Sequence, residues 1–411
     1  MDFTALNGEL AGMVGDTGTG VPGLGVIIFK DGREVYSQFF GRRTVGKISK
    51  PVTRHTRFRV ASVSKIFTIF SVMQLVESGK ISLDDDAGEL LGFELRNPNQ
   101  PREKITVRML ASHTSSLRDG KIYSLPPEVS IEEFFRPDGR FWENGNHFGS
   151  EKVGEFFNYC NLNYGVLATI IEYVKSKRFD TFQKENILRQ LDTKADYLPA
   201  NFAPTEFEQL GTLYRKKNRH GVWNEFGEWF AQIDDFDGVQ PAKDTVALQN
   251  PYAENFCRIC SLENYRVGTN ATFFSPQGGL RISFDELANA LEMLINDGNF
   301  RGQKVLSRSS IAAMIEPQWI YNSRNGDGAF KFYGLGTYRP NFPINLVGHG
   351  GDAFGMLSGF FLVPKTKSGF VYMLNGQAID PDADPRSKGK FHGNFIWEEK
   401  IFNAVCRQIF L

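Results

Sequence analysis

The segment from Ser62 to Ser78, SVSKIFTIFSVMQLVES, decides how the rest of the chain is interpreted. It is apolar on most sides and is followed by Gly79, so it predicts a buried central helix that a glycine ends. Its first turn places the hydroxyl of Ser62 and the amine of Lys65 on one helical face. The amine can accept the hydroxyl proton there, while the helix N-terminus favours the developing negative charge. The segment therefore predicts a nucleophile as well as a helix.

The alternative interpretation of this motif is an N-cap serine followed by a lysine that points to solvent. The residues after Lys65 are too apolar for a surface helix, and burial shifts a lysine amine toward its neutral, basic form. S-x-x-K is by itself a weak pattern that also occurs by chance. A second match, Ser387-Lys388-Gly389-Lys390, stands in the polar stretch DPDADPRSKGKFHG, and we expect it to be a solvated loop.

Strand patterns lie at both ends of the chain. Residues 23–41, GLGVIIFKDGREVYSQFFG, read as two strands joined at the turn Asp31-Gly32. GMLSGFFLVP from Gly355 and FVYML from Phe370 read as two more. Apolar residues recur at helical spacing in four further segments, residues 3–13, 163–177, 284–298 and 396–410. No sustained period marks residues 120–150 and 199–270, which we expect to be irregular or inserted.

These patterns predict one catalytic unit, residues 1–411, of the α/β class in its α+β form. A central antiparallel sheet is built from both termini and flanked by helices, and a mostly helical subdomain is inserted between its two parts. The approximate boundaries are 1–55 and 275–411 for the α/β subdomain and 56–274 for the helical subdomain. No internal repeat or low-complexity linker divides the chain.

Composition excludes several classes of partner. The 411 residues include 47 Lys and Arg and 47 Asp and Glu, so no long-range field favours nucleic acid or an anionic membrane. No segment reaches the about 18 consecutive apolar residues of a membrane span, and the N-terminus lacks the features of a secretory signal. We therefore expect a small-molecule partner and a cytoplasmic location, although a chain whose signal had been removed would look the same. Nothing in the sequence indicates an oligomeric state.

Four cysteines are present, at positions 160, 257, 260 and 406. Cys257-Arg-Ile-Cys260 has the spacing of a zinc or redox pair, but the chain has no second C-x-x-C and no nearby histidine pair to complete four ligands. We expect buried, reduced thiols and neither a metal nor an organic cofactor.

Tyr159-Cys160-Asn161 is the only Y-x-N in the chain, and it precedes the helix expected from Asn163. A loop tyrosine aimed at the nucleophile can act as general base and acid, and Asn161 can orient the lysine and a substrate carbonyl. The alternative is a core aromatic residue beside an N-cap asparagine.

Gly348-His349-Gly350-Gly351-Asp352 lies just before the strand expected from Gly355. Glycines on a strand let a ligand lie against the backbone, and a backbone N–H here can complete an oxyanion hole with the N–H of Ser62. The alternative is a tight turn with a structural histidine.

The three motifs occur in the order serine, tyrosine, strand glycines, and each stands in the context that its role needs. Together S-V-S-K, Y-C-N and H-G-G resemble the serine β-lactamase and penicillin-binding-protein family, in particular its class C, D-aminopeptidase and family VIII esterase branch. The segments RFRVASVSK, ITVRMLASHTSSL and SPQGGLRIS match as well, and the resemblance covers most of residues 20–376.

The resemblance implies a β-lactamase-like fold and a role for each motif. Ser62 would be the acylated nucleophile, Lys65 and Tyr159 the proton shuttle, and the backbone N–H groups of Ser62 and Asp352 the oxyanion hole. Substrate would be bound and oriented by Asn161, His349, Gly350, Gly351 and Asp352.

Three positions depart from the family pattern. His349 replaces the usual lysine, Cys160 the usual serine and Ser116 the usual glycine. A mostly neutral imidazole anchors a substrate carboxylate less well than a permanently charged lysine does.

We therefore expect a serine hydrolase that acts on an ester or amide, such as a small ester or a D-amino-acid amide or peptide, through an acyl-enzyme at Ser62. The same residues would serve an acyltransferase, a D-Ala-D-Ala carboxypeptidase or a β-lactamase. A non-catalytic binding protein would have no chemical reason to keep Ser62, Lys65 and Tyr159 together. The aromatic segment RFWENGNHFG, residues 140–149, is expected either to line the pocket or to pack over the core.

Overall fold

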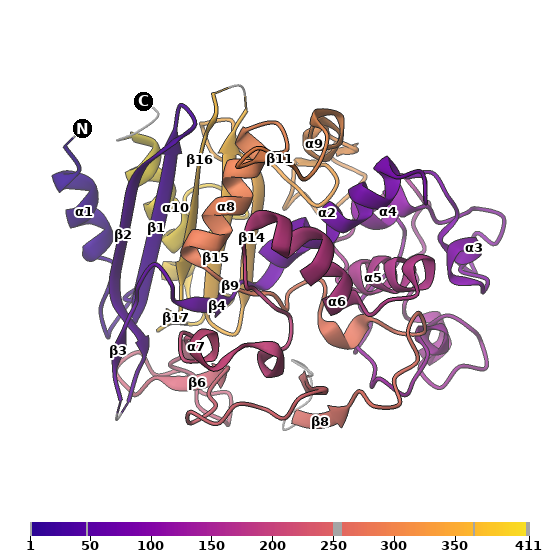
Figure 1. The fold of residues 1–411 in the computed structure, drawn as a ribbon, viewed down its shortest axis with the longest axis horizontal. Helices are drawn as coiled ribbons and strands as arrows, with labels where there is room; N and C mark the ends of the chain where they lie inside the picture. The colour runs from indigo at the N-terminus through magenta and orange to yellow at the C-terminus, as the bar shows by residue number, and fades with distance from the viewer. Residues whose placement is uncertain (1, 47, 250–256, 365, 408–411) are drawn as a thin grey trace.

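The computed structural model describes residues 2–46, 48–249, 257–364 and 366–407. Its largest sheet has six strands in the order β14-β15-β16-β1-β2-β3, and every neighbouring pair is antiparallel (Figure 1). The strands are β1 Gly23–Lys30, β2 Arg33–Thr44, β3 Lys50–Pro51, β14 Val347–Ala353, β15 Met356–Val363 and β16 Ser368–Leu374. The N-terminal and C-terminal parts meet where β1 pairs with β16. The expected α+β fold, with a sheet built from both termini, is confirmed.

Two hairpins of the sheet turn through the same pair of left-handed backbone conformations. Asp31 and Gly32, with φ of 51° and 78°, join β1 to β2, as the Asp-Gly signal predicts. Phe354 and Gly355, with φ of 58° and 91°, join β14 to β15 in the same way. The strand expected near Gly355 is confirmed as β15, which begins at Met356, and the H-G-G motif itself lies on a strand, β14.

Side chains on the two faces of the sheet enter two different cores. Leu24, Val26 and Ile28 of β1 lie in one core with α1 (Thr4–Ala11) and α10 (Ile396–Val405). Ile27 and Phe29 point the other way, into the core that contains α8 (Phe284–Ile295). Strand residues alternate between faces, so a sheet that is apolar on both sides needs helices on both sides. Figure 1 shows α8 on one face and α1 with α10 on the other.

The remaining helices, apart from α7 (Pro204–Phe207), gather at the end of the molecule away from α1 (Figure 1). They are α2 Ser64–Glu77, α3 Ala87–Leu91, α4 Val107–Ala111, α5 Leu162–Lys175, α6 Phe179–Gln183 and α9 Arg308–Ile315. Helix α2 is buried along most of its length and ends before Gly79, whose φ is 64°. The helix expected from Ser62 is therefore present, although its first residues, Ala61–Val63, form a 3-10 turn.

Residues 120–150 contain only short 3-10 turns, as expected from their lack of period. Residues 199–270 are less irregular than expected, because their described parts, 199–249 and 257–270, carry α7 and four strands. The short strands of the molecule are β4 Arg57–Arg59, β5 Leu213–Arg215, β6 Phe230–Ile233, β7 Thr245–Gln249, β8 Cys257–Ser261, β9 Arg281–Ser283, β10 Asn299–Phe300, β11 Gln303–Lys304, β12 Trp319–Ile320, β13 Phe332–Tyr333 and β17 Gly376–Gln377. Strands of two to five residues are too short to show a period. The proposed subdomain boundaries stay a prediction.

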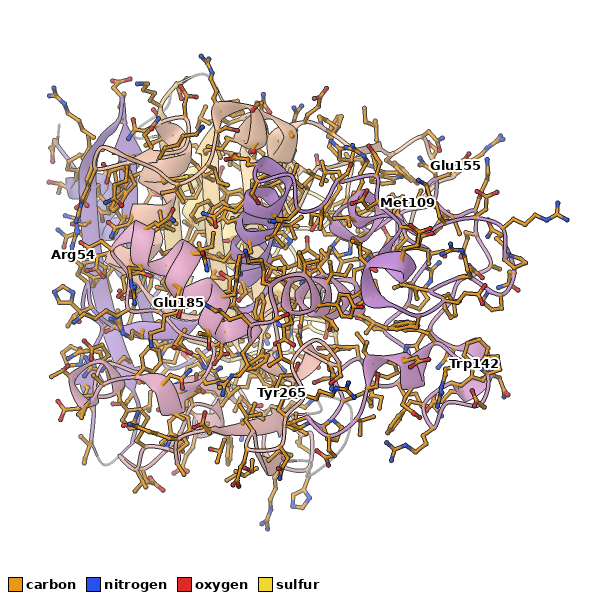
Figure 2. The ribbon with its side chains drawn as sticks, turned by 45° about the vertical axis from the view of Figure 1, so that its right-hand side comes forward. Arg54, Met109, Trp142, Glu155, Glu185 and Tyr265 are labelled. Carbon is orange, nitrogen blue, oxygen red and sulfur yellow. The ribbon has the colours of Figure 1, made fainter. Side chains whose placement is uncertain are left out.

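The aromatic segment 140–149 packs over the helical core. Trp142, labelled in Figure 2, lies against the buried ring of Phe148. Phe148 forms a β-bridge with Leu117, and the N–H of Gly149 donates to the carbonyl of Ser116. Of the two expected roles for this segment, these contacts support packing, and they brace the chain between Ser116 and Arg118.

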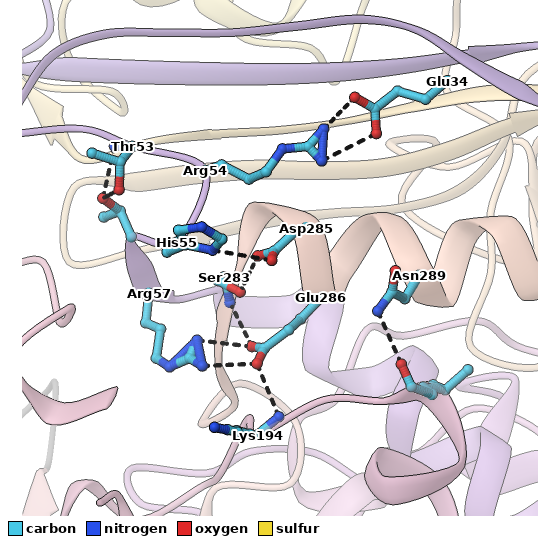
Figure 3. A network of polar contacts seen from close by, with 12 residues as sticks. Glu34, Thr53, Arg54, His55, Arg57, Lys194, Ser283, Asp285, Glu286 and Asn289 are labelled. Atoms are coloured by element: carbon cyan, nitrogen blue, oxygen red, sulfur yellow. Dashed lines mark hydrogen bonds and ion pairs between the residues drawn. The ribbon is translucent and has the colours of Figure 1, made fainter. Parts of the chain in front are cut away.

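A buried ion pair anchors the strand that leads to Ser62. Arg57 of β4 donates from both terminal nitrogens to the carboxylate of Glu286 in α8, at 2.8 and 3.0 Å (Figure 3). The same carboxylate accepts the backbone N–H groups of Lys194 and Ser283. A buried pair whose remaining lone pairs are satisfied in this way holds its two elements in one register. It fixes β4 against the helix beneath the sheet.

The thiols of Cys160 and Cys406 are buried. The side chain of Cys257 lies outside the described residues, so the interpretation of the Cys257–Cys260 pair stays a prediction. Within the described ranges, no group of three or more His, Cys, Asp or Glu side chains is arranged to hold a metal ion. Over the same ranges, no helix has the length and apolar character needed to cross a membrane.

Candidate active site

Ser62 stands where β4 turns into α2. The residue before it, Ala61, has a left-handed φ of 46°, which is unfavourable for a residue with a side chain. Neighbouring elements hold this turn: the hydroxyl of Ser358 donates to the carbonyl of Val60 at 2.8 Å, and the N–H of Val60 donates to Leu280 at 2.9 Å. Ser62 is half-buried while the residues on both sides are buried. The turn thus leaves the hydroxyl of Ser62 accessible between two buried neighbours.

The neighbouring hydroxyl, on Ser64, has a structural role. It donates to the carbonyl of Ala61 at 2.7 Å and accepts the N–H of Leu280 at 3.1 Å, and it is fully buried. Ser64 therefore helps to stabilise the turn that exposes Ser62.

Lys65 is buried with 0% of its surface exposed, and its amine faces three oxygen atoms. The Nζ donates to the Oγ of Ser62 at 3.1 Å, to the Oδ1 of Asn161 at 2.8 Å and to the carbonyl of Gln277 at 3.1 Å. Burial lowers the pKa of Lys65 to about 7, and the nearby carboxylate of Asp119 opposes that shift. The amine is therefore a base that is partly neutral at physiological pH, in direct contact with the Ser62 hydroxyl.

Asp119 is a site residue that the sequence analysis missed. One of its oxygens accepts the Nδ2 of Asn161 at 2.9 Å, and the other accepts the N–H of Leu162 at 2.9 Å. The first contact fixes the orientation of the Asn161 amide, so that its oxygen faces Lys65. Asp119 follows the matched segment ITVRMLASHTSSL by two positions, but neither its type nor its spacing indicates a partner at Asn161.

Tyr159 lies beside the serine and the lysine. The Lys65 amine is 4.7 Å from the centre of its ring, and Phe330 stacks against the ring at 5.7 Å with the planes 6° apart. Burial raises the pKa of the Tyr159 hydroxyl, and a hydrogen bond with Ser62 only partly offsets this effect. The phenol therefore keeps its proton at neutral pH.

Strand β14 passes directly against the turn at Ser62. A Cβ on Gly351 would lie 2.5 Å from the carbonyl of Val60, closer than a side chain can approach, and 3.1 Å from the nitrogen of Ser62. Gly351 is thus required by the close approach of two backbones.

We infer that the backbone N–H of Asp352 points away from β15, at the edge of the sheet that Tyr338 partly pairs. The N–H of Gly348 donates to the carbonyl of Tyr338 at 3.0 Å, and that of Gly350 donates to its hydroxyl at 3.2 Å, both away from β15. N–H directions alternate along a strand, so the N–H of Asp352 shares this direction. The side chain of Asp352 is exposed, and it lies on the face of β14 opposite to Gly351.

His349 is 2% exposed and uses both ring nitrogens within the protein. Its Nε2 lies 3.0 Å from the hydroxyl of Tyr333, and its Nδ1 bonds to the carbonyl of Gly350. Burial, and secondly the charge of Lys65, lower the pKa of His349 to about 3, so the imidazole is neutral. The expected contact between His349 and a substrate stays a prediction.

Ser116, where the family pattern has glycine, adopts a left-handed φ of 65°. This conformation explains the usual glycine, and in this chain the Ser116 hydroxyl accepts a hydrogen bond from Asn97 at 2.9 Å.

The fold and the order of these motifs are those of the class of β-lactamase-like proteins. The chain belongs to the Beta-lactamase family, whose family model matches residues 10–392.

Among curated proteins, the chain is 26% identical over 203 residues to "Protein flp" of Staphylococcus aureus (strain NCTC 8325 / PS 47). That match covers 48% of this chain and 37% of flp, so the chain spans well under half the length of this relative.

Among the solved structures that share the fold, three illustrate its range. A penicillin-binding protein homologue from Pyrococcus abyssi, described as octameric, has a TM-score of 0.66 at 23% identity and covers 99% of this chain and 77% of its own. A D-amino acid amidase from Ochrobactrum anthropi SV3 has a TM-score of 0.64 at 17% identity and covers 98% of both chains. EstCE1, described as a hydrolase with promiscuous acyltransferase activity, has a TM-score of 0.62 at 17% identity and covers 98% and 97%. At these identities the likeness extends to the fold alone.

Proposed function

We propose that this protein is a serine hydrolase in which Ser62 attacks the carbonyl of a small ester or amide and is acylated by it. The observation that carries the proposal is the 3.1 Å contact between the Ser62 hydroxyl and a buried lysine amine whose pKa is about 7. A base with a pKa near the working pH combines the correct protonation state with a useful driving force for proton transfer.

In the first half-reaction the neutral amine of Lys65 takes the proton of Ser62 as Oγ bonds to the carbonyl carbon. The oxygen of the tetrahedral intermediate accepts the N–H groups of Ser62 and Asp352. The intermediate collapses, the bond to the leaving group breaks, and the phenol of Tyr159 gives that group its proton. The ammonium of Lys65 then returns a proton to Tyr159.

In the second half-reaction a water molecule attacks the acyl carbon and loses its proton to the neutral Lys65 amine. The Ser62 oxygen leaves and is reprotonated, which restores the site. The raised pKa of Tyr159 supports the assignment of Lys65 as base and of Tyr159 as proton donor, since a phenol that keeps its proton is an acid.

The electrostatics of the site favour neutral substrates. Lys65 is occupied by three protein oxygens, and His349 carries no charge at neutral pH. A substrate carboxylate therefore lacks the fixed cation that a lysine at position 349 would provide. The names of the structural relatives, an amidase and an esterase-type hydrolase, are consistent with this substrate class.

A substrate panel tests the proposal. We expect p-nitrophenyl acetate or butyrate and D-amino-acid amides to be turned over with a larger kcat/KM than nitrocefin. A preference for nitrocefin or other carboxylate substrates by a large factor would instead indicate a β-lactamase or carboxypeptidase. Added amine or alcohol acceptors, with product analysis, separate hydrolysis from the acyl transfer that EstCE1 also performs.

A further inference from the structure

His113 makes contact with the chain on both sides of Tyr159. Its carbonyl accepts the N–H of Asn158 at 2.9 Å, and its ring Nδ1 accepts the N–H of Cys160 at 3.1 Å. The imidazole also lies 4.5 Å from the Tyr159 ring, centre to centre. One residue thus fixes the two peptide groups that flank the proposed proton donor.

The Cys160 contact determines which nitrogen of His113 carries the proton. Because Nδ1 accepts, Nε2 must be the N–H, and it lies 3.1 Å from the hydroxyl of Tyr333. That hydroxyl then donates to the Nε2 of His349 at 3.0 Å, and the Nδ1–H of His349 donates to the carbonyl of Gly350. Four hydrogen bonds therefore run in one direction from the Tyr159 loop to strand β14.

The backbone of His113 separates this series of hydrogen bonds from ordinary core packing. His113 is 1% exposed, yet it adopts a left-handed φ of 59°, a conformation that a buried non-glycine residue keeps only where its surroundings impose it. Every polar atom of the His113 and His349 rings has a partner. Paired nitrogens are required of any buried histidine, whereas the strained backbone of His113 is not explained by the filling of space.

The surroundings of this series of hydrogen bonds favour the neutral forms of His113 and Tyr333. Burial is the main cause that lowers the pKa of His113, and the charge of Lys65 acts in the same direction. Tyr333 is buried, which raises the pKa of its hydroxyl. Neutral imidazoles with fixed tautomers keep the direction of the hydrogen bonds constant across the working pH range.

We propose that His113 is a positioning residue that holds Tyr159 against Ser62, and that Tyr333 links it through His349 to the oxyanion strand β14. The inference rests on the proposed function of Ser62 and Tyr159. None of the three linking residues touches the reacting atoms. They determine the positions of the Tyr159 hydroxyl and of the backbone N–H on β14. A misplacement of about 1 Å costs on the order of 10²-fold in rate.

The test is a double-mutant cycle of His113→Ala and Tyr159→Phe, measured on p-nitrophenyl butyrate. In the wild-type background we expect His113→Ala to lower kcat by about 10²-fold with KM changed less than about threefold. In the Tyr159→Phe background the same substitution should cost less than about threefold, because the group it positions is already lost. Equal losses in both backgrounds would overturn the inference.

His113→Asn distinguishes positioning from stability. Asparagine tolerates the left-handed conformation and can offer its Oδ1 to the N–H of Cys160, so we expect at least about tenfold recovery of kcat relative to alanine. If the asparagine variant were as slow as the alanine variant although its melting temperature were higher, the assignment would be wrong.

Tyr333→Phe removes only the central hydroxyl and tests the link to β14. We expect a loss of kcat of about three- to tenfold, the size of one hydrogen bond worth about 1 kcal/mol. Tyr36→Phe is the matched control, because it deletes a buried hydroxyl that bonds to Asn7 far along the sheet, and its kcat should stay within about twofold of wild type. An unchanged rate in Tyr333→Phe would overturn the link.

The cycle keeps this inference separate from the proposed function. Full activity of Tyr159→Phe alone would refute the role of Tyr159 and, with it, the positioning role of His113. A slow Tyr159→Phe variant combined with an additive His113→Ala effect would refute only the positioning role.

Discussion

Ser62 and Ser387 each precede a lysine by three residues, but their hydroxyls face different partners. The Ser62 hydroxyl is half-buried and accepts from the buried amine of Lys65. The Ser387 hydroxyl donates to the backbone carbonyls of Pro381 and Asp384, at 2.8 and 2.6 Å, while Lys390 is exposed. The expectation of a solvated loop was wrong for Ser387, which is buried in a 3-10 turn.

The comparison shows which further conditions a serine and a lysine at S-x-x-K spacing must meet to form a reactive site. A helix must follow the serine, so that the lysine returns to the same face. The lysine must also be buried, so that its amine loses its proton near neutral pH, and the hydroxyl must have no carbonyl that engages its proton. Ser62 meets these conditions, whereas Ser387 has the spacing alone.

Removing each serine gives the largest expected contrast. Ser62→Ala should reduce ester turnover by about 10⁵-fold or more, since the covalent step is lost. Ser387→Ala should leave kcat within about twofold. Melting curves serve as the control, because Ser62→Ala removes no buried protein contact apart from the lysine and tyrosine and should hardly change the midpoint. Near-normal turnover by Ser62→Ala would contradict the assignment of Ser62 as the nucleophile.

Replacing each lysine gives the next contrast. Lys65→Met should lower kcat by about 10² to 10⁴-fold, the range for a positioned proton-transfer group, whereas Lys390→Met should have no measurable effect. A kcat close to that of the wild type in both Lys65→Met and Lys390→Met would contradict the difference between the two sites.

The same lysine pair predicts different pH dependences of stability for the two variants. The pKa of Lys65 is about 7 in the folded protein and about 10.4 in an unfolded chain, so between these values the unfolded state binds more protons. The free energy of unfolding of the wild type should therefore rise with pH from about 7 to about 10, and Lys65→Met should lack this slope. Urea titrations at several pH values measure it, with Lys390→Met as control.

How much of this could be predicted from the sequence depends on the distance between partners. The helix from Ser62 and the burial of Lys65 follow from local apolar pattern, and the two hairpin strands from an Asp-Gly turn. His113, Asp119 and Tyr333 were missed, because their partners stand 16 to 220 residues away and no local spacing indicates such contacts. Family resemblance supplied the motifs, and only the fold brought these partners together.

A smaller effect than those of the substitutions above is expected in the pH dependence of kcat/KM. The rate should rise with pH and level off above about 7, because Lys65 must be neutral to accept the proton of Ser62. Asp119→Asn removes the carboxylate that favours the ammonium form, so the rising limb should move to lower pH. Asp138→Asn, an exposed aspartate, is the matched control. A limb that moved upward in Asp119→Asn would show that Asp119 acts on Lys65 in the opposite sense.

The most direct test of the central claim is the site and pH dependence of covalent labelling. Wild-type protein is treated with a fluorophosphonate probe, and the adduct is located by intact mass and peptide mapping. The account predicts one adduct, on Ser62, formed at a rate that rises with pH through about 7, absent in Ser62→Ala and retained in Ser387→Ala. An adduct that persists in Ser62→Ala, or a labelling rate that does not change between pH 5 and 9, would contradict it.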